Sequence, residues 1–340
     1  MRIRMVRSGA AALAAGALFL ALAVATAARA DEPIVMKITL PTLNDAPHIF
    51  SKNLAARVEK DSGGRIKAEV YPASQLGSIP RQIEGVQFGA IQCIIVPPEF
   101  MVGIDDRFQI MASPGLVESM KQAQRLVLDP DVLKLMLGLG TSKGLHGVAM
   151  FVALPSDVIS KTPIRHLADF KGKKIRIFAS DFQKVAFERL GATPIAMTLG
   201  DVLPAIQQGT IDGSIAAMPV YTAMQYQDAA KYVTETGQPY IFLFVALSEK
   251  WRASLPPDLQ QIVEKAIVEE APAINPVAEK VLDDANKQWA ERGGERIFLP
   301  PDEQASMLKT FSTVAEDVAS KKPEIAAAYK IVSDAAQRDK

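Results

Sequence analysis

Strand-like and helix-like segments alternate along the first part of the chain, and this alternation is the strongest constraint on the fold. Three segments are typical of strands: residues 34–40, 66–71 and 91–96. Between the first two, Phe50, Leu54 and Val58 recur at the four-residue spacing of a helix, which Gly63 and Gly64 end. Strands that alternate with helices favour an α/β fold with a largely parallel sheet.

The same alternation returns in a second block. Residues 174–178 are typical of a strand, and Ser180 is a suitable cap for the helix that follows. Residues 211–217 then combine a turn with a further strand. The chain therefore contains two α/β blocks.

A long helical stripe comes after the second block. Apolar side chains continue at helical spacing across residues 258–292, and Gly293 and Gly294 close the pattern. A helix of roughly 30 residues is about 45 Å long, which exceeds a small domain. We predict one long helix that runs along both blocks, with a kink at Pro272 or Pro276.

The first thirty residues have the three parts of a secretory signal. Arg2, Arg4 and Arg7 precede an uncharged apolar run over residues 10–28, and the small residues of 28–30 fit a cleavage site after Ala30. A membrane anchor is the alternative interpretation, because the run is close to the shortest length that spans a bilayer. We predict cleavage and a periplasmic mature protein.

Composition limits the classes of function. The 340 residues less the first 30 leave 310, enough for two cores. The first 30 hold four arginines and no acid, so 38 basic and 38 acidic side chains become 34 and 38, a net charge of −4. This balance argues against nucleic acid as a partner. The single cysteine, Cys93, permits no disulfide within the chain and fits a buried strand.

The sequence lacks a convincing catalytic, metal or nucleotide motif. Three histidines occur without the spacing of a zinc site, and the residues at 138–143 do not complete a dinucleotide-binding fingerprint. Residues 140–144 match G-x-S-x-G, which would make Ser142 the nucleophile of a secreted hydrolase. That motif needs a strand before it and a helix after it, whereas the pattern here is reversed. We predict a protein that is not an enzyme, has no cofactor and carries no metal-ligating motif; whether a metal ion assists ligand binding is left open by the sequence.

Arg176 is the most informative charged residue. It lies between apolar neighbours in the strand at 174–178, and strand alternation places it on the same face as Phe178. A guanidinium inside a sheet requires an anionic partner, and its planar fork matches a carboxylate. From the spacing alone, that partner is either an internal acid or a bound organic acid.

Four segments in order resemble the substrate-binding proteins of tripartite ATP-independent periplasmic (TRAP) transporters, of the dicarboxylate-binding type. The segments are residues 55–77 with their closing P-x-x-Q-L-G, residues 163–176 ending in K-I-R, residues 191–213 ending in D-G, and residues 255–259. The resemblance implies a periplasmic-binding-protein-like fold of two α/β lobes joined by a hinge. It also implies an organic acid ligand held by Arg176, and delivery to the integral membrane subunits of the transporter.

The resemblance and the strand pattern together suggest domain bounds. We expect lobe I over residues 31–153 and 242–280, and lobe II over residues 154–241. The helix at 258–292 would span both lobes, and residues 293–340 would pack back on them.

Departures from the family pattern suggest the class of ligand. Ala217 and Met218 stand where sialic-acid-binding relatives carry polar groups, and Pro98 stands where some relatives present an acid. With Phe178 beside Arg176, such walls favour an aromatic or branched monocarboxylate; a C4-dicarboxylate or 2-oxo acid is the alternative. Asn44 and His48 lie where a strand end meets a helix N-terminus, so we include them in the predicted site.

Overall fold

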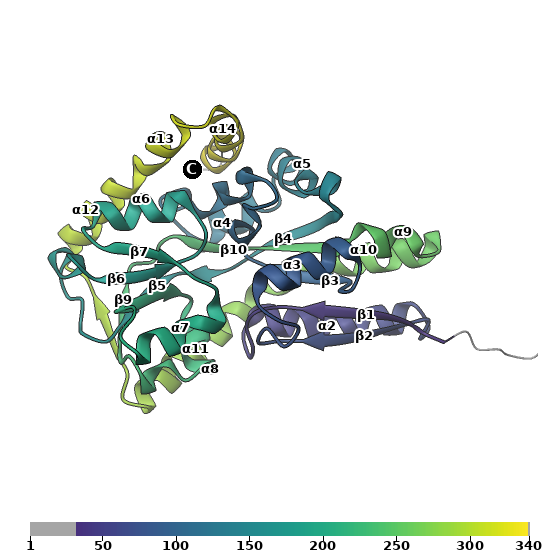
Figure 1. The fold of residues 1–340 in the computed structure, drawn as a ribbon, viewed down its shortest axis with the longest axis horizontal. Coiled ribbons are helices and arrows are strands. Elements are labelled where there is room, and N and C mark those ends of the chain that lie inside the picture. Colours follow the sequence, from purple (N-terminus) through teal and green to yellow (C-terminus); the bar gives the residue numbers. More distant parts are fainter. Residues whose placement is uncertain (1–31, 339–340) are drawn as a thin grey trace, which may run out of the picture.

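The computed structural model describes residues 32–338, and it contains two β-sheets that form the centres of two lobes (Figure 1). The predicted signal sequence over residues 1–30 lies outside the described residues. The sheet of lobe I has the order β2-β1-β3-β10-β4: β1 (Ile34–Thr39), β2 (Ile66–Tyr71), β3 (Cys93–Val96), β4 (Leu145–Pro155) and β10 (Tyr240–Ser248). The sheet of lobe II has the order β11-β9-β5-β8-β6-β7: β5 (Asp157–Ser160), β6 (Lys174–Ile177), β7 (Thr193–Ala196), β8 (Gly213–Ala216), β9 (Tyr232–Glu235) and β11 (Glu295–Phe298).

Each sheet is mixed, so the prediction of a largely parallel sheet holds only in part. In lobe I, β1 pairs in parallel with β2 and β3, but β10 runs antiparallel to β3 and β4. In lobe II, β6 pairs in parallel with β7 and β8, but β5 runs antiparallel to β8 and β9. The reason is that β5 and β10 each enter their sheet directly from the other lobe and not through a helical crossover.

Two connections between strands cross from one lobe to the other, and they lie side by side. The chain passes from β4 to β5 at Ser156, and it returns from β9 to β10 through residues 236–239. Ser156 donates from both N and Oγ to Pro239 O, at 2.9 and 2.8 Å. Thr236 Oγ1 donates in return to Ser156 O at 3.1 Å. The two crossings are therefore bonded to each other where the lobes meet.

A third crossing is helical. The predicted helix at 258–292 is two helices, α10 (Pro257–Ala273) and α11 (Asn275–Glu291), separated at Ile274. Pro272 and Pro276 flank this break, and because proline cannot donate a helical hydrogen bond, the predicted kink is a complete interruption. Helix α10 packs on α2 (Ala46–Asp61) of lobe I, and α11 packs on α8 (Met218–Ala223) of lobe II (Figure 1).

The other helices pack on the sheets or on one another. They are α3 (Ile79–Phe88), α4 (Met120–Leu126), α5 (Pro130–Gly138), α6 (Asp181–Arg189), α7 (Leu199–Gln207), α9 (Glu249–Ser254), α12 (Pro301–Ser312), α13 (Val314–Ala319) and α14 (Pro323–Gln337). The C-terminal helices cross the lobes once more: α12 and α13 pack on α6, and α14 packs on α4 and α5. Among the described residues, no helix has the length and apolar character needed to cross a membrane.

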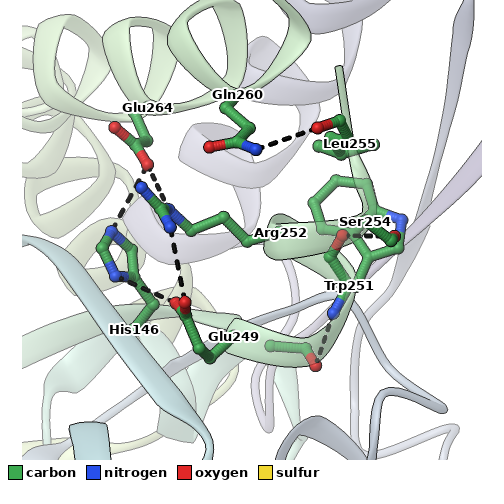
Figure 2. A network of polar contacts seen from close by, with 9 residues as sticks. His146, Glu249, Trp251, Arg252, Ser254, Leu255, Gln260 and Glu264 are labelled. Carbon is green, nitrogen blue, oxygen red and sulfur yellow. Dashed lines mark hydrogen bonds and ion pairs between the residues drawn. The ribbon is translucent and has the colours of Figure 1, made fainter. Parts of the chain in front are cut away.

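A polar network ties β4 to α9 and α10 in lobe I (Figure 2). The two ring nitrogens of His146 lie 3.3 Å from Glu249 Oε2 and 3.4 Å from Glu264 Oε1. Arg252 contacts the same two carboxylates, at 2.5 Å from Glu264 and 3.4 Å from Glu249. The network joins a strand of the lobe I sheet to two helices, so we interpret it as a structural clamp.

This clamp leads to a stability prediction. Changing Glu264 to Ala removes the acid that Arg252 and His146 share, and since all members are only partly buried we expect a loss of about 1 kcal/mol in unfolding free energy. Thermal unfolding is the measurement. Gln261→Ala, an exposed change on the same helix, is the control and should leave the melting temperature nearly unchanged. Equal melting temperatures for the two variants would show that the clamp contributes no stability.

Candidate ligand-binding site

A cavity of about 60 Å³ lies between the lobes, at the carboxyl ends of parallel strands from both sheets. Lobe I contributes Pro41, Thr42, Asp45, Pro47, Ile79, Pro97, Phe100, Ala153, Ile241 and Leu243. Lobe II contributes Arg176, Phe178, Leu199, Ala216, Ala217 and Val220. Open α/β sheets bind ligands outside the carboxyl ends of their strands, so this cavity has the position of a ligand site.

Arg176 reaches the cavity from β6 and is held by the strands on either side. Its side chain is fully buried. Nε donates to Met197 O, just after β7, at 2.9 Å, and Nη1 donates to Ile215 O, in β8, at 3.1 Å. These two bonds fix the plane of the guanidinium, and the other N–H groups remain available for a ligand.

The guanidinium has no acidic partner within the described part of the chain. No carboxylate lies at ion-pairing distance from Arg176, and its two hydrogen bonds go to neutral backbone oxygens. Burial lowers the pKa of Arg176 to about 10, although Tyr226, Tyr221 and Glu99 act to raise it. The residue therefore keeps its positive charge at neutral pH. A buried cation without a counterion is costly, which favours an anion from solution as the missing partner.

Two aromatic rings flank this cation. The Cζ of Arg176 lies 4.7 Å from the ring centroid of Phe178 and 6.0 Å from that of Phe100. The two rings, one from each lobe, have centroids 5.3 Å apart. Both distances to the cation fall within the range of cation–π attraction. The aromatic pair thus joins the lobes directly beside the charged group.

The rest of the wall is almost entirely apolar. Among the lining residues, Thr42 and Asp45 are the polar members besides Arg176, and Asp45 is already engaged as the cap of α2, where it accepts from His48 N at 3.1 Å. Burial raises the pKa of Asp45 to about 6, and hydrogen bonds from Thr42 and His48 act against this rise. The cavity therefore offers one strong cation and mostly carbon surface.

Glu99 lies next to the cavity and was not predicted from the sequence. It is buried in the short 3-10 helix Pro98–Met101 of lobe I, directly before Phe100. Across the cleft, Gln183 Nε2 of α6 donates to Glu99 Oε1 at 3.3 Å, while Gln183 Oε1 accepts from Phe178 N at 2.9 Å. The available sequence signal was a charged residue three positions after the end of the buried strand β3, and it was missed behind the two prolines.

Three of the predicted site residues line this cavity together: Arg176, Phe178 and Ala217. The other four lie around it. Pro98 is buried beside the lining residue Pro97, and Met218 lines a separate hollow near Asp157. His48 is buried and its Nδ1 accepts from Asn44 N at 2.9 Å, and Asn44 lines an outer hollow with Pro219. The positions of these four residues in the sequence place them near the cavity, but their side chains do not line it.

The structure also bears on the alternative chemistry. Ser142 is exposed in a short 3-10 helix, Thr141–Lys143, that follows α5 and precedes β4. A nucleophile elbow has the opposite order, strand then helix. Within residues 32–338, no cluster of three or more His, Cys, Asp or Glu side chains is arranged to hold a metal ion. The G-x-S-x-G match therefore lacks the context that a nucleophile needs.

Similarity to known proteins agrees with this geometry. Residues 40–322 match the bacterial extracellular solute-binding proteins of family 7. The C4-dicarboxylate-binding periplasmic protein DctP of Rhodobacter capsulatus is 27% identical over 312 residues, which cover 90% of this chain and 92% of that protein.

Solved structures show the same fold. A TRAP periplasmic solute-binding protein from Desulfovibrio salexigens with bound orotic acid has a TM-score of 0.84 and 23% identity, covering 89% of this chain and 99% of that one. The sugar-acid-binding protein of Advenella mimigardefordensis with galactonate has a TM-score of 0.85 and 20% identity, covering 90% and 99%.

Proposed function

The chain belongs to family 7 of the bacterial extracellular solute-binding proteins, the substrate-binding proteins of TRAP transporters, and on that premise we propose that it captures an aromatic or branched monocarboxylate. The observation that carries the proposal is the buried guanidinium of Arg176, which has no counterion among residues 32–338 and faces an apolar, aromatic cavity. A carboxylate supplies the charge that Arg176 lacks, through two parallel hydrogen bonds.

The walls of the cavity favour an acid whose remaining part is apolar. Burial of apolar ligand surface contributes about 25 cal/mol per Å², whereas a ligand hydroxyl left without a partner costs about 1–3 kcal/mol. Leu199, Val220 and Leu243 offer no hydrogen bond to a sugar acid or to a second carboxylate. Phe178 and Phe100 offer a surface on which a planar group can pack.

The same geometry supports capture by closure. Arg176 is fully buried, and lining residues come from both lobes, so an acid reaches it when the lobes separate. The paired crossings at Ser156 and residues 236–239 are suited to act as the hinge. A ligand that contacts both lobes then favours the closed state.

The cellular role follows from the family and the N-terminus. We propose that the signal is cleaved after Ala30, and that the mature protein works in the periplasm. It would deliver the bound acid to the membrane subunits of a TRAP transporter. We propose no enzymatic activity, because Ser142 lacks the strand–turn–helix context of a hydrolase.

A competition titration tests the ligand class. The mature protein is titrated by calorimetry with benzoate, 3-methyl-2-oxobutanoate, succinate and galacturonate. We expect benzoate or the branched 2-oxo acid to bind at least about tenfold more tightly than the other two, a difference of about 1.4 kcal/mol. The relative from Rhodobacter capsulatus is named for C4-dicarboxylates, so tightest binding of succinate would transfer that class to this chain. Tightest binding of galacturonate would instead show that the walls accept a hydroxylated ligand.

A further inference from the structure

We propose that Glu99 takes up a proton when a ligand carboxylate binds Arg176, so that ligand capture is coupled to protonation of the closed cleft. This inference rests on the proposed function, because it requires an anionic ligand at Arg176. It concerns an acid to which the proposed function assigns no role.

The surroundings of Glu99 lack any cation at ion-pairing distance within the described residues. Its carboxyl is buried, with 3% of the residue exposed, and its side-chain partner across the cleft is the neutral amide of Gln183 at 3.3 Å. The positive charge of Arg176, whose Cζ lies 6.0 Å from the ring centroid of the adjacent Phe100, is the charge that acts on Glu99. Burial raises the pKa of Glu99 to about 7, and Arg176 acts to lower it.

Other charged groups on the neighbouring elements are paired elsewhere or face away. The elements packed against the 3-10 helix of Glu99 are α3, β10 and the 3-10 helix Asp106–Ala112. Their ion pairs are Arg81 with Glu84, Arg107 with Asp105, and Lys322 with Asp106 and Asp181. The remaining titratable groups of these elements and of Gln183's helix are Tyr240 of β10 and, on α6, Lys184, Glu188 and Arg189, the last of which pairs with Asp317. None of them acts on the pKa of Glu99.

Ligand binding changes this balance in one direction. A carboxylate on Arg176 neutralises the charge that favours ionised Glu99, and it adds a negative charge to the same dry space. The pKa of Glu99 should therefore rise further in the complex, and one proton should bind with the ligand where the free protein is ionised. Because the complex then holds more protons than the free protein, affinity should fall as pH rises above about 7.

The Glu99 amide variant separates charge from hydrogen bonding. In Glu99→Gln, the side-chain oxygen can still accept from Gln183, but the group no longer titrates. We expect the wild type to lose up to about tenfold in affinity between about pH 7 and pH 8, whereas Glu99→Gln should bind equally well at both. Glu99→Ala, which lacks the bond to Gln183, should also be independent of pH but weaker throughout.

The measurement is calorimetry with the four acids named above, in two buffers of different ionisation enthalpy. We expect the wild type to take up close to one proton for each ligand bound, and Glu99→Gln to take up none. A second comparison uses Asp45→Asn, which should keep the pH dependence if Glu99 is its source.

Four outcomes would overturn the proposal. Binding that Arg176→Ala abolishes but that shows no proton uptake contradicts this inference and leaves the proposed function intact. A pH dependence that persists in Glu99→Gln, or disappears in Asp45→Asn, assigns the proton to another group. Failure of all four acids to bind removes the proposed function and this inference together.

Discussion

Arg176→Ala should lower the affinity for the bound acid by at least about 30-fold. The wild-type guanidinium is buried, and no residue in the described part of the chain is its counterion, so we expect the ligand carboxylate to be its charge partner in a dry site. Loss of a buried, charge-assisted contact costs about 2–5 kcal/mol, which corresponds to this factor or more. Calorimetry with the tightest-binding acid is the measurement.

Two further variants make this result specific. Arg176→Lys keeps the charge but loses the planar fork that donates two parallel hydrogen bonds, so its affinity should lie between those of the wild type and the alanine variant. Arg81→Ala removes an exposed arginine from α3 and should leave binding unchanged. Near-wild-type affinity in Arg176→Ala, with the fold intact by circular dichroism, would show that the carboxylate binds elsewhere.

A second large effect is expected at Ala217. This residue lines the cavity from the turn after β8, and the whole cavity measures about 60 Å³. A phenyl ring at this position would fill the space that the body of the ligand needs. We expect Ala217→Phe to lower affinity at least about 100-fold, or about 2.7 kcal/mol, with a modest loss of stability from overpacking.

The matched control changes chemistry and keeps size. Ala217→Ser adds one hydroxyl to the same wall, and its affinity for an apolar acid should stay within a few-fold of the wild type. If Ala217→Phe binds the acid as well as Ala217→Ser does, the ligand does not occupy this cavity.

Arg176 also relates stability to function. The ligand-free protein carries the cost of a buried cation whose bonds go only to backbone oxygens. Binding of an anion to the native state removes this cost and stabilises the fold in proportion to the logarithm of ligand concentration. On the proposed function, selectivity for acids follows from one buried charge that no acid of the described residues matches.

The sequence was sufficient for the elements that local pattern controls. The alternation around Arg176 correctly placed a strand that buries this side chain, and Ser180 caps α6 as expected, accepting from Gln183 N at 3.4 Å. The two α/β units are likewise visible in the spacing of apolar residues. These features depend on residues that are close together in the sequence, so a local sequence pattern is enough to predict them.

Features that depend on distant segments were not predicted. Phe100 and Glu99 meet Phe178 and Gln183 only because two lobes fold against each other, and no spacing within either segment reports that contact. The direction of β10 depends on its route back from lobe II. Asn44 lies in the expected loop, where it has a positive φ of 55° and its N–H donates to His48. It lines an outer hollow and not the cavity between the lobes.

The central claim is that one organic acid binds between the lobes with its carboxylate on Arg176. A crystal structure of the mature protein with the tightest-binding acid tests it most directly. We predict a closed cleft, with both carboxylate oxygens within about 3.2 Å of guanidinium nitrogens and the body of the acid between Phe178 and Ala217. An acid bound in another hollow, or turned so that its carboxylate faces away from Arg176, would contradict the account.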